Sequence, residues 1–221
     1  PNGAGKTTLM KSLTGYIEPN IGSVTIDEIN VIKNPLPAQQ MIGYLPENAP
    51  LYPDLSVQSQ LKMIADLRGI PIKAQSELIS AAVARTGIST ELTRPIRELS
   101  KGYRQRVGIA QSILHLPRVL ILDEPTAGLD PTQVIEIRKL IKELTATSTI
   151  LLSTHILSEV EAICDRVIVL VNGHVAADVV ISELVKKSFY KVSLKGIVSE
   201  AKEIITQIAG VDEVILDANK S

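Results

Sequence analysis

Short apolar runs, separated by polar turns, divide this sequence into alternating strands and helices. Residues 119–122 form a continuous apolar run, and residues 149–153 form a second strand pattern after an amphipathic stretch. A short apolar run is typical of a buried strand in a parallel sheet, because helices cover both faces of such a sheet. Asp130 and Pro131 predict the start of a helix between the two runs, which extends to about Leu144. The pattern therefore predicts an α/β fold with a mostly parallel sheet.

Three predicted helices follow one another without a strand between them. They cover residues 57–68, 73–86 and about 101–115, and Ser100 precedes the third as a capping residue. Consecutive helices inside an α/β pattern indicate a helical insert. We therefore expect a helical subdomain at about residues 54–116.

Further elements surround this core. The dipeptide Asn172-Gly173 favours a two-residue hairpin turn, because both residues adopt positive φ angles readily. The other predicted elements are a helix from residue 6 to near residue 15, strands at 23–26 and 41–45, a helix at 156–163, and hairpin strands at 166–171 and 174–180.

The end of the chain predicts a small accessory piece. Residues 190–194, 200–209 and 211–216 have the pattern of a strand, a helix and a strand. We expect two domains, a larger α/β domain at residues 1–185 and a small C-terminal α/β appendage at residues 186–221.

The composition narrows the classes of function. Apolar residues make up 45% of the chain, but aromatic residues make up only 3%. Stacking of single-stranded nucleic acid needs aromatic side chains, and a net charge of −1 gives no basic excess for a polyphosphate backbone. We therefore expect no nucleic-acid partner. The apolar runs are far shorter than the roughly 18 residues of a membrane span, and the single cysteine, Cys164, excludes disulfides within the chain.

The chain opens on a glycine-containing loop before its first predicted helix. Gly5, Lys6 and Thr7 match the end of the phosphate-binding motif G-x-x-x-x-G-K-[ST], whose first glycine would lie just before Pro1. In such a loop, backbone N–H groups bind phosphate oxygens, the lysine binds the β- and γ-phosphates, and the hydroxyl residue binds Mg²⁺. Alone, the stretch is also compatible with an ordinary helix-opening turn. The residues expected to bind nucleotide are Asn2, Gly3, Ala4, Gly5, Lys6, Thr7 and Thr8.

Two acidic residues, Asp123 and Glu124, directly follow the apolar run at 119–122. Ligands of open α/β sheets bind at the carboxyl ends of the strands. At that place Asp123 can hold Mg²⁺ through water, and Glu124 can polarise the water that attacks the γ-phosphate. Two solvated acids at a strand end are the alternative, which the phosphate loop upstream disfavours.

The most specific motif lies at the start of the third predicted helix of the insert, Leu99-Ser100-Lys101-Gly102-Tyr103-Arg104-Gln105-Arg106. It resembles the Leu-Ser-Gly-Gly-Gln signature of ATP-binding cassette (ABC) transporter ATPases, which Gln-Arg closely follows. Lys101 and Tyr103 replace one Gly and the Gln of this signature. The resemblance covers roughly residues 1–185 and implies a P-loop NTPase of ABC type. It also implies that Ser100 and Gly102 contact the γ-phosphate of ATP bound to a partner subunit.

Three shorter segments are similar to other loops of this family. Asp130 lies in a Gly-Leu-Asp-Pro stretch that is similar to the D-loop, which crosses the dimer interface, and His155 lies in a segment that is similar to the switch that reaches the γ-phosphate. Glu47 stands where the family carries a Gln loop, and its carboxylate can ligate Mg²⁺ while adding negative charge. The resemblance thus implies that the catalytic residues are Glu124 and His155 and that the metal ligands are Thr7, Asp123 and Glu47.

The resemblance further implies a function and partners. The expected activity is hydrolysis of ATP, with Mg²⁺, by one half of a head-to-tail dimer of ATPase subunits. This dimer would energise a separate membrane permease from the cytoplasmic, inner face of the cell membrane. The signature and the Leu-Pro-Glu stretch are most similar to the gliding-motility, sodium-export and drug-export branch, which implies an exporter. Because the family has a strand that leads into the phosphate loop, we expect the chain to be N-terminally truncated.

Two other functions remain open. A soluble, non-transport ABC ATPase in DNA repair or on the ribosome shares these motifs, although no sustained heptads of a repair-type coiled coil separate the phosphate loop from the signature. A non-hydrolysing nucleotide-binding regulatory module is the second alternative, and Glu124 and His155 argue against it. A GTPase is disfavoured because the sequence has no Asn-Lys-x-Asp motif.

Overall fold

The computed structural model describes residues 3–185 and 204–205. The chain divides into two compact units, Pro1–Ser182 and Glu183–Ser221. The predicted domain boundary after residue 185 stays a prediction. The predicted strand–helix–strand tail lies outside the described residues, apart from residues 204–205, which are helical.

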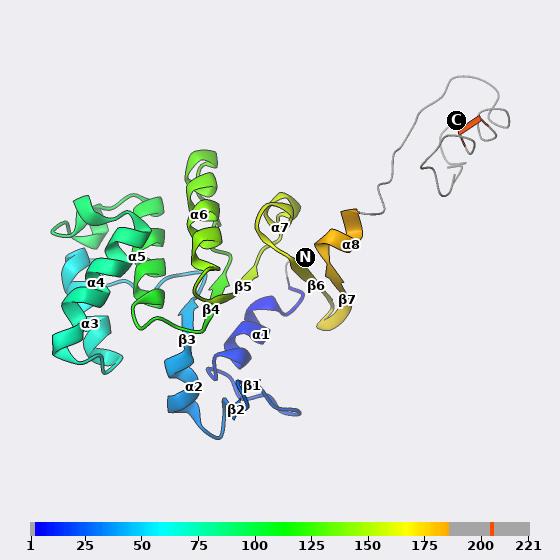
Figure 1. Ribbon diagram of the computed structural model, residues 1–221, viewed down its shortest axis with the longest axis horizontal. Coiled ribbons are helices and arrows are strands. Elements are labelled where there is room, and N and C mark those ends of the chain that lie inside the picture. The colour runs from blue at the N-terminus through cyan, green and yellow to red at the C-terminus, as the bar shows by residue number, and fades with distance from the viewer. Residues whose placement is uncertain (1–2, 186–203, 206–221) are drawn as a thin grey trace. The chain divides into compact units, whose positions relative to one another are not determined.

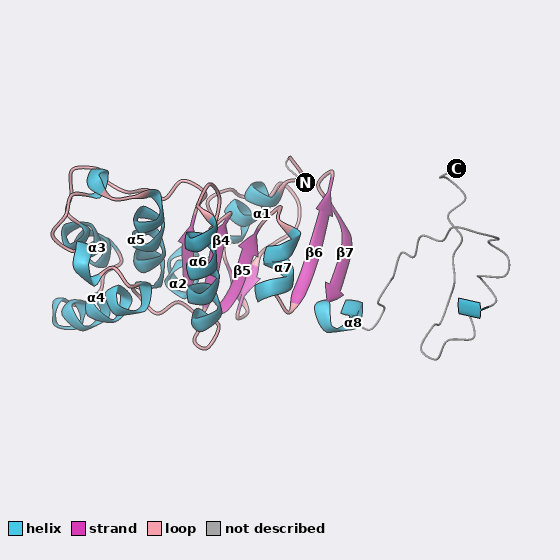
Figure 2. Cartoon of the chain, turned by 90° about the horizontal axis from the view of Figure 1, so that it is seen from above, coloured by secondary structure: helices cyan, strands magenta, loops and turns pink. Residues whose placement is uncertain are grey.

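Three parallel strands form the centre of the first unit (Figure 2). β3 (Ile42–Leu45) pairs with β4 (Val119–Asp123), and β4 pairs with β5 (Thr149–Ser153). Parallel neighbours cannot be joined by a tight turn, and each of these connections contains at least one helix. The predicted parallel sheet is confirmed. Its consequence for the site is that all three strands run in one direction and end at one edge.

Helices lie against this sheet (Figure 1). Side chains that alternate along β4 pack against these helices. The helices are α1 (Lys6–Leu13), α5 (Lys101–Ile113) and α6 (Pro131–Leu144). Leu120 and Leu122 belong to the large core formed with α5 and α6, whereas Ile121 packs with Met10 of α1 in a separate cluster. Successive strand residues point to opposite faces, so one apolar run supplies both cores. Each such buried side chain contributes about 1.5–3 kcal/mol of burial free energy.

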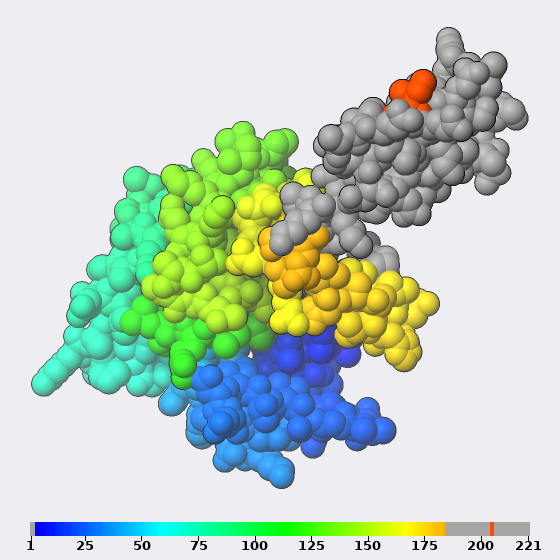
Figure 3. Space-filling view, turned by 45° about the vertical axis from the view of Figure 1, so that its right-hand side comes forward, coloured from blue at the N-terminus to red at the C-terminus, as the bar shows by residue number. Residues whose placement is uncertain are grey.

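The three predicted successive helices are present between β3 and β4. They are α3 (Val57–Leu67), α4 (Ile72–Thr86) and α5, and two short 3₁₀ segments, Ser89–Glu91 and Ile96–Glu98, connect α4 to α5. The Ser100 hydroxyl accepts a hydrogen bond from the Tyr103 N–H at 3.3 Å and caps α5, as predicted. Figure 3 shows this helical segment gathered on one flank of the unit, beside α6.

Two antiparallel hairpins complete the first unit. The small one pairs β1 (Thr25–Ile26) with β2 (Ile29–Asn30), and the larger one pairs β6 (Arg166–Val171) with β7 (His174–Val180). The turn between β6 and β7 has φ angles of 50° and 78° at Asn172 and Gly173. Positive φ at both central residues is what a type I′ hairpin requires, so the prediction from this dipeptide is confirmed. The remaining helices are α7 (Leu157–Ile163) and α8 (Ile181–Val185).

One helix was not predicted. α2 (Pro35–Met41) precedes β3, so Met41 ends a helix instead of starting the strand. Asn34 lies at the N-cap and Pro35 at the first helical position, where a missing N–H costs nothing. The predicted end of α5 near His115 also lies two residues too far, because α5 ends at Ile113. Among the described residues, no helix combines the length and apolar character needed to span a bilayer.

His115 joins the segment after α5 to the start of β3. Its Nε2 lies 3.0 Å from the carbonyl oxygen of Ile42, to which the neutral ring donates. Burial and, to a smaller extent, the nearby Arg68 charge together lower the pKa of His115 to about 4, although the Ile42 hydrogen bond acts to raise it. The histidine therefore packs in its neutral form.

The unfolding free energy should fall with pH in the window from 6.5 down to about 4. In that window the unfolded chain binds a proton at His115 that the folded chain does not yet bind, so protons favour unfolding. His115→Gln keeps an N–H donor for Ile42 and removes the titration. Urea denaturation at several pH values should show a steeper decline for the wild type than for this variant.

The exposed His174→Gln is the matched control and should keep the wild-type pH dependence. An equally steep decline in His115→Gln would contradict the assigned role of His115.

Candidate functional site

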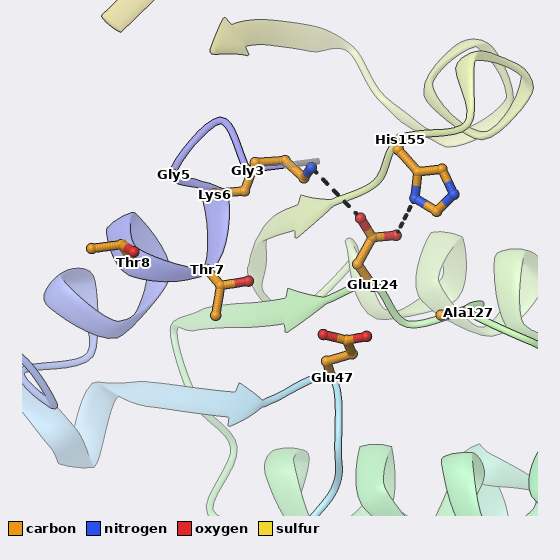
Figure 4. A pocket seen from close by; sticks show the side chains of 9 residues that line it. All are labelled: Gly3, Gly5, Lys6, Thr7, Thr8, Glu47, Glu124, Ala127 and His155. Atoms are coloured by element: carbon orange, nitrogen blue, oxygen red, sulfur yellow. Dashed lines mark hydrogen bonds and ion pairs between the residues drawn. The ribbon is translucent and has the colours of Figure 1, made fainter. Parts of the chain in front are cut away.

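The candidate site lies at the edge where the three parallel strands end. Glu47 follows β3, Glu124 follows β4 directly, and His155 follows β5. Open α/β sheets bind ligands at this edge. A pocket of about 430 Å³ opens there, and Figure 4 shows its lining. The lining residues are Gly3, Gly5, Lys6, Thr7, Thr8, Glu47, Glu124, Ala127 and His155.

The glycine loop forms one wall of this pocket and leads into α1. Gly3 and Gly5 have φ angles of 74° and 96°, which only glycine adopts readily. The turn of the β6–β7 hairpin supports the loop, because the Gly173 N–H donates to the Ala4 carbonyl at 3.2 Å. The first N–H groups of α1 have no partner within the helix, so the helix presents donors and a positive dipole end to an anion.

Three ionisable side chains meet inside the pocket. Lys6 Nζ lies 3.8 Å from Glu124 Oε1, and His155 Nδ1 lies 2.9 Å from Glu124 Oε2. The dashed lines in Figure 4 mark these two contacts. The Glu124 side chain is 12% exposed, whereas that of His155 is 47% exposed. Glu124 therefore occupies the centre of the site, between a cation from the loop and an imidazole from the end of β5.

The backbone of Glu124 adopts an uncommon conformation. Its φ angle is 49°, in the left-handed region that a non-glycine residue enters only at a cost. Two hydrogen bonds hold it there. The Glu124 N–H donates to Ser153 Oγ at 2.9 Å, and the Ala127 N–H donates to the Glu124 carbonyl at 3.1 Å. The resulting turn points the carboxylate into the pocket.

Asp123 lies behind the pocket and does not line it. The residue is 1% exposed, and its Oδ1 accepts a hydrogen bond from Ser153 Oγ at 2.5 Å. Its Oδ2 is buried and has no hydrogen-bond partner within the described part of the chain. This oxygen is therefore a buried hydrogen-bond acceptor next to the pocket. The charge of Asp123 also acts on Tyr44: burial raises the pKa of the Tyr44 phenol, and the charges of Asp123 and Tyr16 raise it further.

The residues present fit Mg²⁺ as a companion of bound phosphates. Thr7 and Glu47 supply oxygen atoms to the pocket, and the second oxygen of Asp123 remains available behind it. Within residues 3–185 and 204–205, no cluster of three His, Cys, Asp or Glu residues could hold a metal ion. Mg²⁺ commonly binds to one or two carboxylates together with substrate phosphates and water. This donor set agrees with that mode of binding.

Three other expected site residues lie outside this pocket. Among the described residues, Ser100, Gly102 and Asp130 do not line this pocket; Asp130 caps α6 through its bond from the Gln133 N–H at 2.9 Å. Gly102 packs against the Gln133 side chain so closely that an added Cβ would lie 2.6 Å from it. Thr8 lines the pocket, next to Thr7 in the first turn of α1. Asn2 lies outside the described residues.

The sequence matches the family model for ABC transporters over residues 1–127. The chain belongs to the ABC transporter family. The matched segment contains the phosphate loop, the signature, Asp123 and Glu124.

Known ABC proteins resemble this chain over most of its length. The ABC transporter ATP-binding protein YdbJ of Bacillus subtilis is 41% identical over 81% of the chain, which spans 58% of YdbJ. The lantibiotic transport ATP-binding protein SrtF of Streptococcus pyogenes is 36% identical over 79% of the chain and 74% of SrtF. The solved structure of cbiO1 from Clostridium perfringens has a TM-score of 0.75 and 30% identity, covering 93% of this chain and 80% of that one. These likenesses confirm the predicted P-loop fold of ABC type.

Sequence reasoning missed the buried polar residues that support this ABC site. Ser153 joins Asp123 to the backbone of Glu124, and Glu159 on α7 binds two threonine hydroxyls close to the site. Ser153 lies two residues before His155. The signal that could have identified Ser153 is its place as a polar residue at the end of β5, directly after three apolar residues.

Ser153→Ala should lower the unfolding free energy by about 1–3 kcal/mol, because it leaves a buried carboxylate oxygen and a backbone N–H without their shared partner. Denaturant unfolding measures the change. Ser80→Ala on the exposed face of α4 is the control and should stay within about 0.5 kcal/mol of the wild type. Equal losses in the two variants would contradict the bridging role of Ser153.

Proposed function

We propose that this chain is the subunit of an ABC transporter that binds and hydrolyses ATP. The observation that carries the proposal is the meeting of Lys6, Glu124 and His155 in one pocket at the start of α1. A cation and the N-terminus of a helix suit phosphates, and a carboxylate held by an imidazole suits activation of water. The names of YdbJ and SrtF, an ABC transporter ATP-binding protein and a transport ATP-binding protein, support this assignment.

The pocket offers a division of roles for ATP binding. The loop N–H groups, from Gly3 to Thr8, would bind phosphate oxygens, and Lys6 would add a positive charge at the β- and γ-phosphates. Thr7 and Glu47 would hold Mg²⁺ with Asp123 behind them. The bound ion would neutralise charge on the phosphate oxygens.

Glu124 would act as the general base. Its carboxylate would accept a proton from water as the water oxygen bonds to the γ-phosphorus and the bond to the ADP oxygen breaks. His155 donates to Glu124 through Nδ1–H and so orients the carboxylate. Because Lys6 also pairs with Glu124, phosphate binding would draw the lysine away and leave the base to the water. The products would be ADP and phosphate.

The position of the signature supports a composite site between two subunits. Ser100 and Gly102 do not line the pocket that holds Lys6. In the proposed head-to-tail dimer, each signature would contact the ATP of the partner subunit, and Asp130 would lie in the loop that crosses the interface. A separate permease subunit at the inner face of the membrane would use the motion. The similarity to cbiO1, which is part of the ABC transporter complex cbiONQ, supports such an assembly, and export is the proposed direction.

Glu124→Gln should abolish turnover and preserve ATP binding. The amide keeps the size of the side chain but cannot accept the proton, and loss of a general base typically costs about 10²–10⁴-fold in rate. Phosphate release and nucleotide titration with the intact protein measure the two effects. Glu161→Gln, on the exposed side of α7, should leave both unchanged. Turnover by Glu124→Gln near that of the wild type would exclude Glu124 as the base.

Two inactive variants should restore activity to each other if the site is shared between subunits. Lys6→Ala removes the charge at the phosphates, and Ser100→Arg puts a bulky group at the start of α5. A mixed dimer places both defects in one composite site and leaves the other site intact. Phosphate release by the mixture should therefore exceed that of either variant alone.

Mixing each variant with more of itself is the control and should restore nothing. Normal hydrolysis by Ser100→Arg alone would contradict a role for Ser100 at the partner's phosphate.

A further inference from the structure

Glu159 is a buried carboxylate that joins the two chain segments carrying Glu124 and His155. It lies at the start of α7 and is 1% exposed. Its Oε1 accepts a hydrogen bond from Thr126 Oγ1 at 2.5 Å, and its Oε2 accepts one from Thr154 Oγ1 at 2.6 Å. Thr126 comes two residues after Glu124, and Thr154 comes directly before His155.

The two threonines transmit this contact to the backbone on each side of the site. Thr154 Oγ1, which donates to Glu159, also accepts from the Ile156 N–H at 3.1 Å, so the hydroxyl fixes the backbone around His155. On the other side, the Leu129 N–H donates to the Thr126 carbonyl at 3.2 Å, immediately after the turn that begins at Glu124. One side chain thus restrains both turns.

Ser153 makes a second cross-link between the same two segments. Its hydroxyl binds Asp123 and the Glu124 N–H directly at the strand ends. Glu159 links Thr126 and Thr154, which follow the last paired residues of β4 and β5. Glu124 lies between Asp123 and Thr126 in the sequence, and His155 lies between Ser153 and Glu159.

The surroundings of Glu159 suit an ionised acceptor that takes no part in the chemistry. Arg138 of α6 places Nη2 at 3.6 Å from Oε1, which compensates a buried negative charge. Both oxygens are already engaged by hydroxyl donors, and Glu159 does not line the pocket. Its carboxylate is therefore in no position to accept a proton from a bound water.

We propose that Glu159 is a positioning residue that holds the His155–Glu124 pair in its reactive geometry. This inference rests on the proposed hydrolysis of ATP only for the expected change in kcat. The 2.9 Å contact between Nδ1 and Oε2 spans two turns that start on different strands. Without Glu159, each turn loses one of its restraints, and a misplacement of about 1 Å can cost a factor of 10² in rate.

The kinetic test replaces Glu159 with Gln in the intact protein. The amide keeps the volume but has one acceptor oxygen for two hydroxyl donors. We expect kcat for ATP hydrolysis to fall about 10- to 100-fold, while the Kd for ATP changes less than about twofold, because Glu159 does not line the pocket. Glu161→Gln, two residues along the same helix and exposed, is the matched control and should leave kcat unchanged.

A spectroscopic test reads the geometry without hydrolysis. The sequence has three histidines, so ¹⁵N-histidine spectra resolve His155 from His115 and His174. In the wild type, His155 should show the tautomer protonated at Nδ1, which the Glu124 carboxylate stabilises. Glu159→Gln should shift the His155 nitrogens toward an averaged tautomer and leave those of His115 unchanged.

Two further variants cover the case in which Glu159→Gln does not fold. Thr154→Val and Thr126→Val each remove one of the two hydroxyls and keep the side-chain shape. Each should lower kcat less than Glu159→Gln does, and Thr154→Val should shift the His155 signals. A folded Glu159→Gln or Thr154→Val protein with wild-type kcat and wild-type His155 signals would overturn the proposal.

The two proposals fail separately. A wild-type protein that binds ATP without hydrolysing it would refute the proposed function, and the histidine spectra would still decide the role of Glu159. A loss of ATP affinity equal to the loss of kcat would show a general structural defect and would also overturn the positioning role.

Discussion

The parallel pairing of β3, β4 and β5 is the constraint on which the site depends. The register places Leu45 beside Leu122 and Asp123 beside Ser153, so the segments that follow all three strands begin at one edge. Because side chains alternate along a strand, a shift of one residue would turn Asp123 to the opposite face. The apolar run of β4, buried against helices, therefore determines where the acids of the site lie.

The features that the sequence predicted well depend on neighbouring residues. The φ angles of Asn172 and Gly173, the caps at Ser100 and Asp130, and the apolar strand before Asp123 are each determined by a few consecutive side chains. Such signals are visible in one sequence because no distant contact is needed to produce them. The short motifs then indicated which strand ends carry chemistry.

The features that the sequence did not predict depend on contacts between distant segments. Glu159 has the pattern of an ordinary polar residue at a helix start, yet α6 and the turns after β4 and β5 bury it. The hydrogen bond between Ser153 and Asp123 was not predicted either, because it depends on the register that places β5 beside β4. α2 was missed because its helical pattern is short and Pro35 resembles a turn signal. Burial of a polar side chain is a tertiary property, which a local pattern does not contain.

The contact between Gly173 and Ala4 has a consequence for folding kinetics. The loop that would bind phosphates is synthesised long before the hairpin whose N–H holds its backbone. The pairing of β3 with β4 is also non-local, because three helices lie between the two strands in the sequence. Chains with a high contact order close their long loops slowly. The loop therefore gains this support only after the residues between Ala4 and Gly173 have been synthesised and the two ends of that long stretch have met.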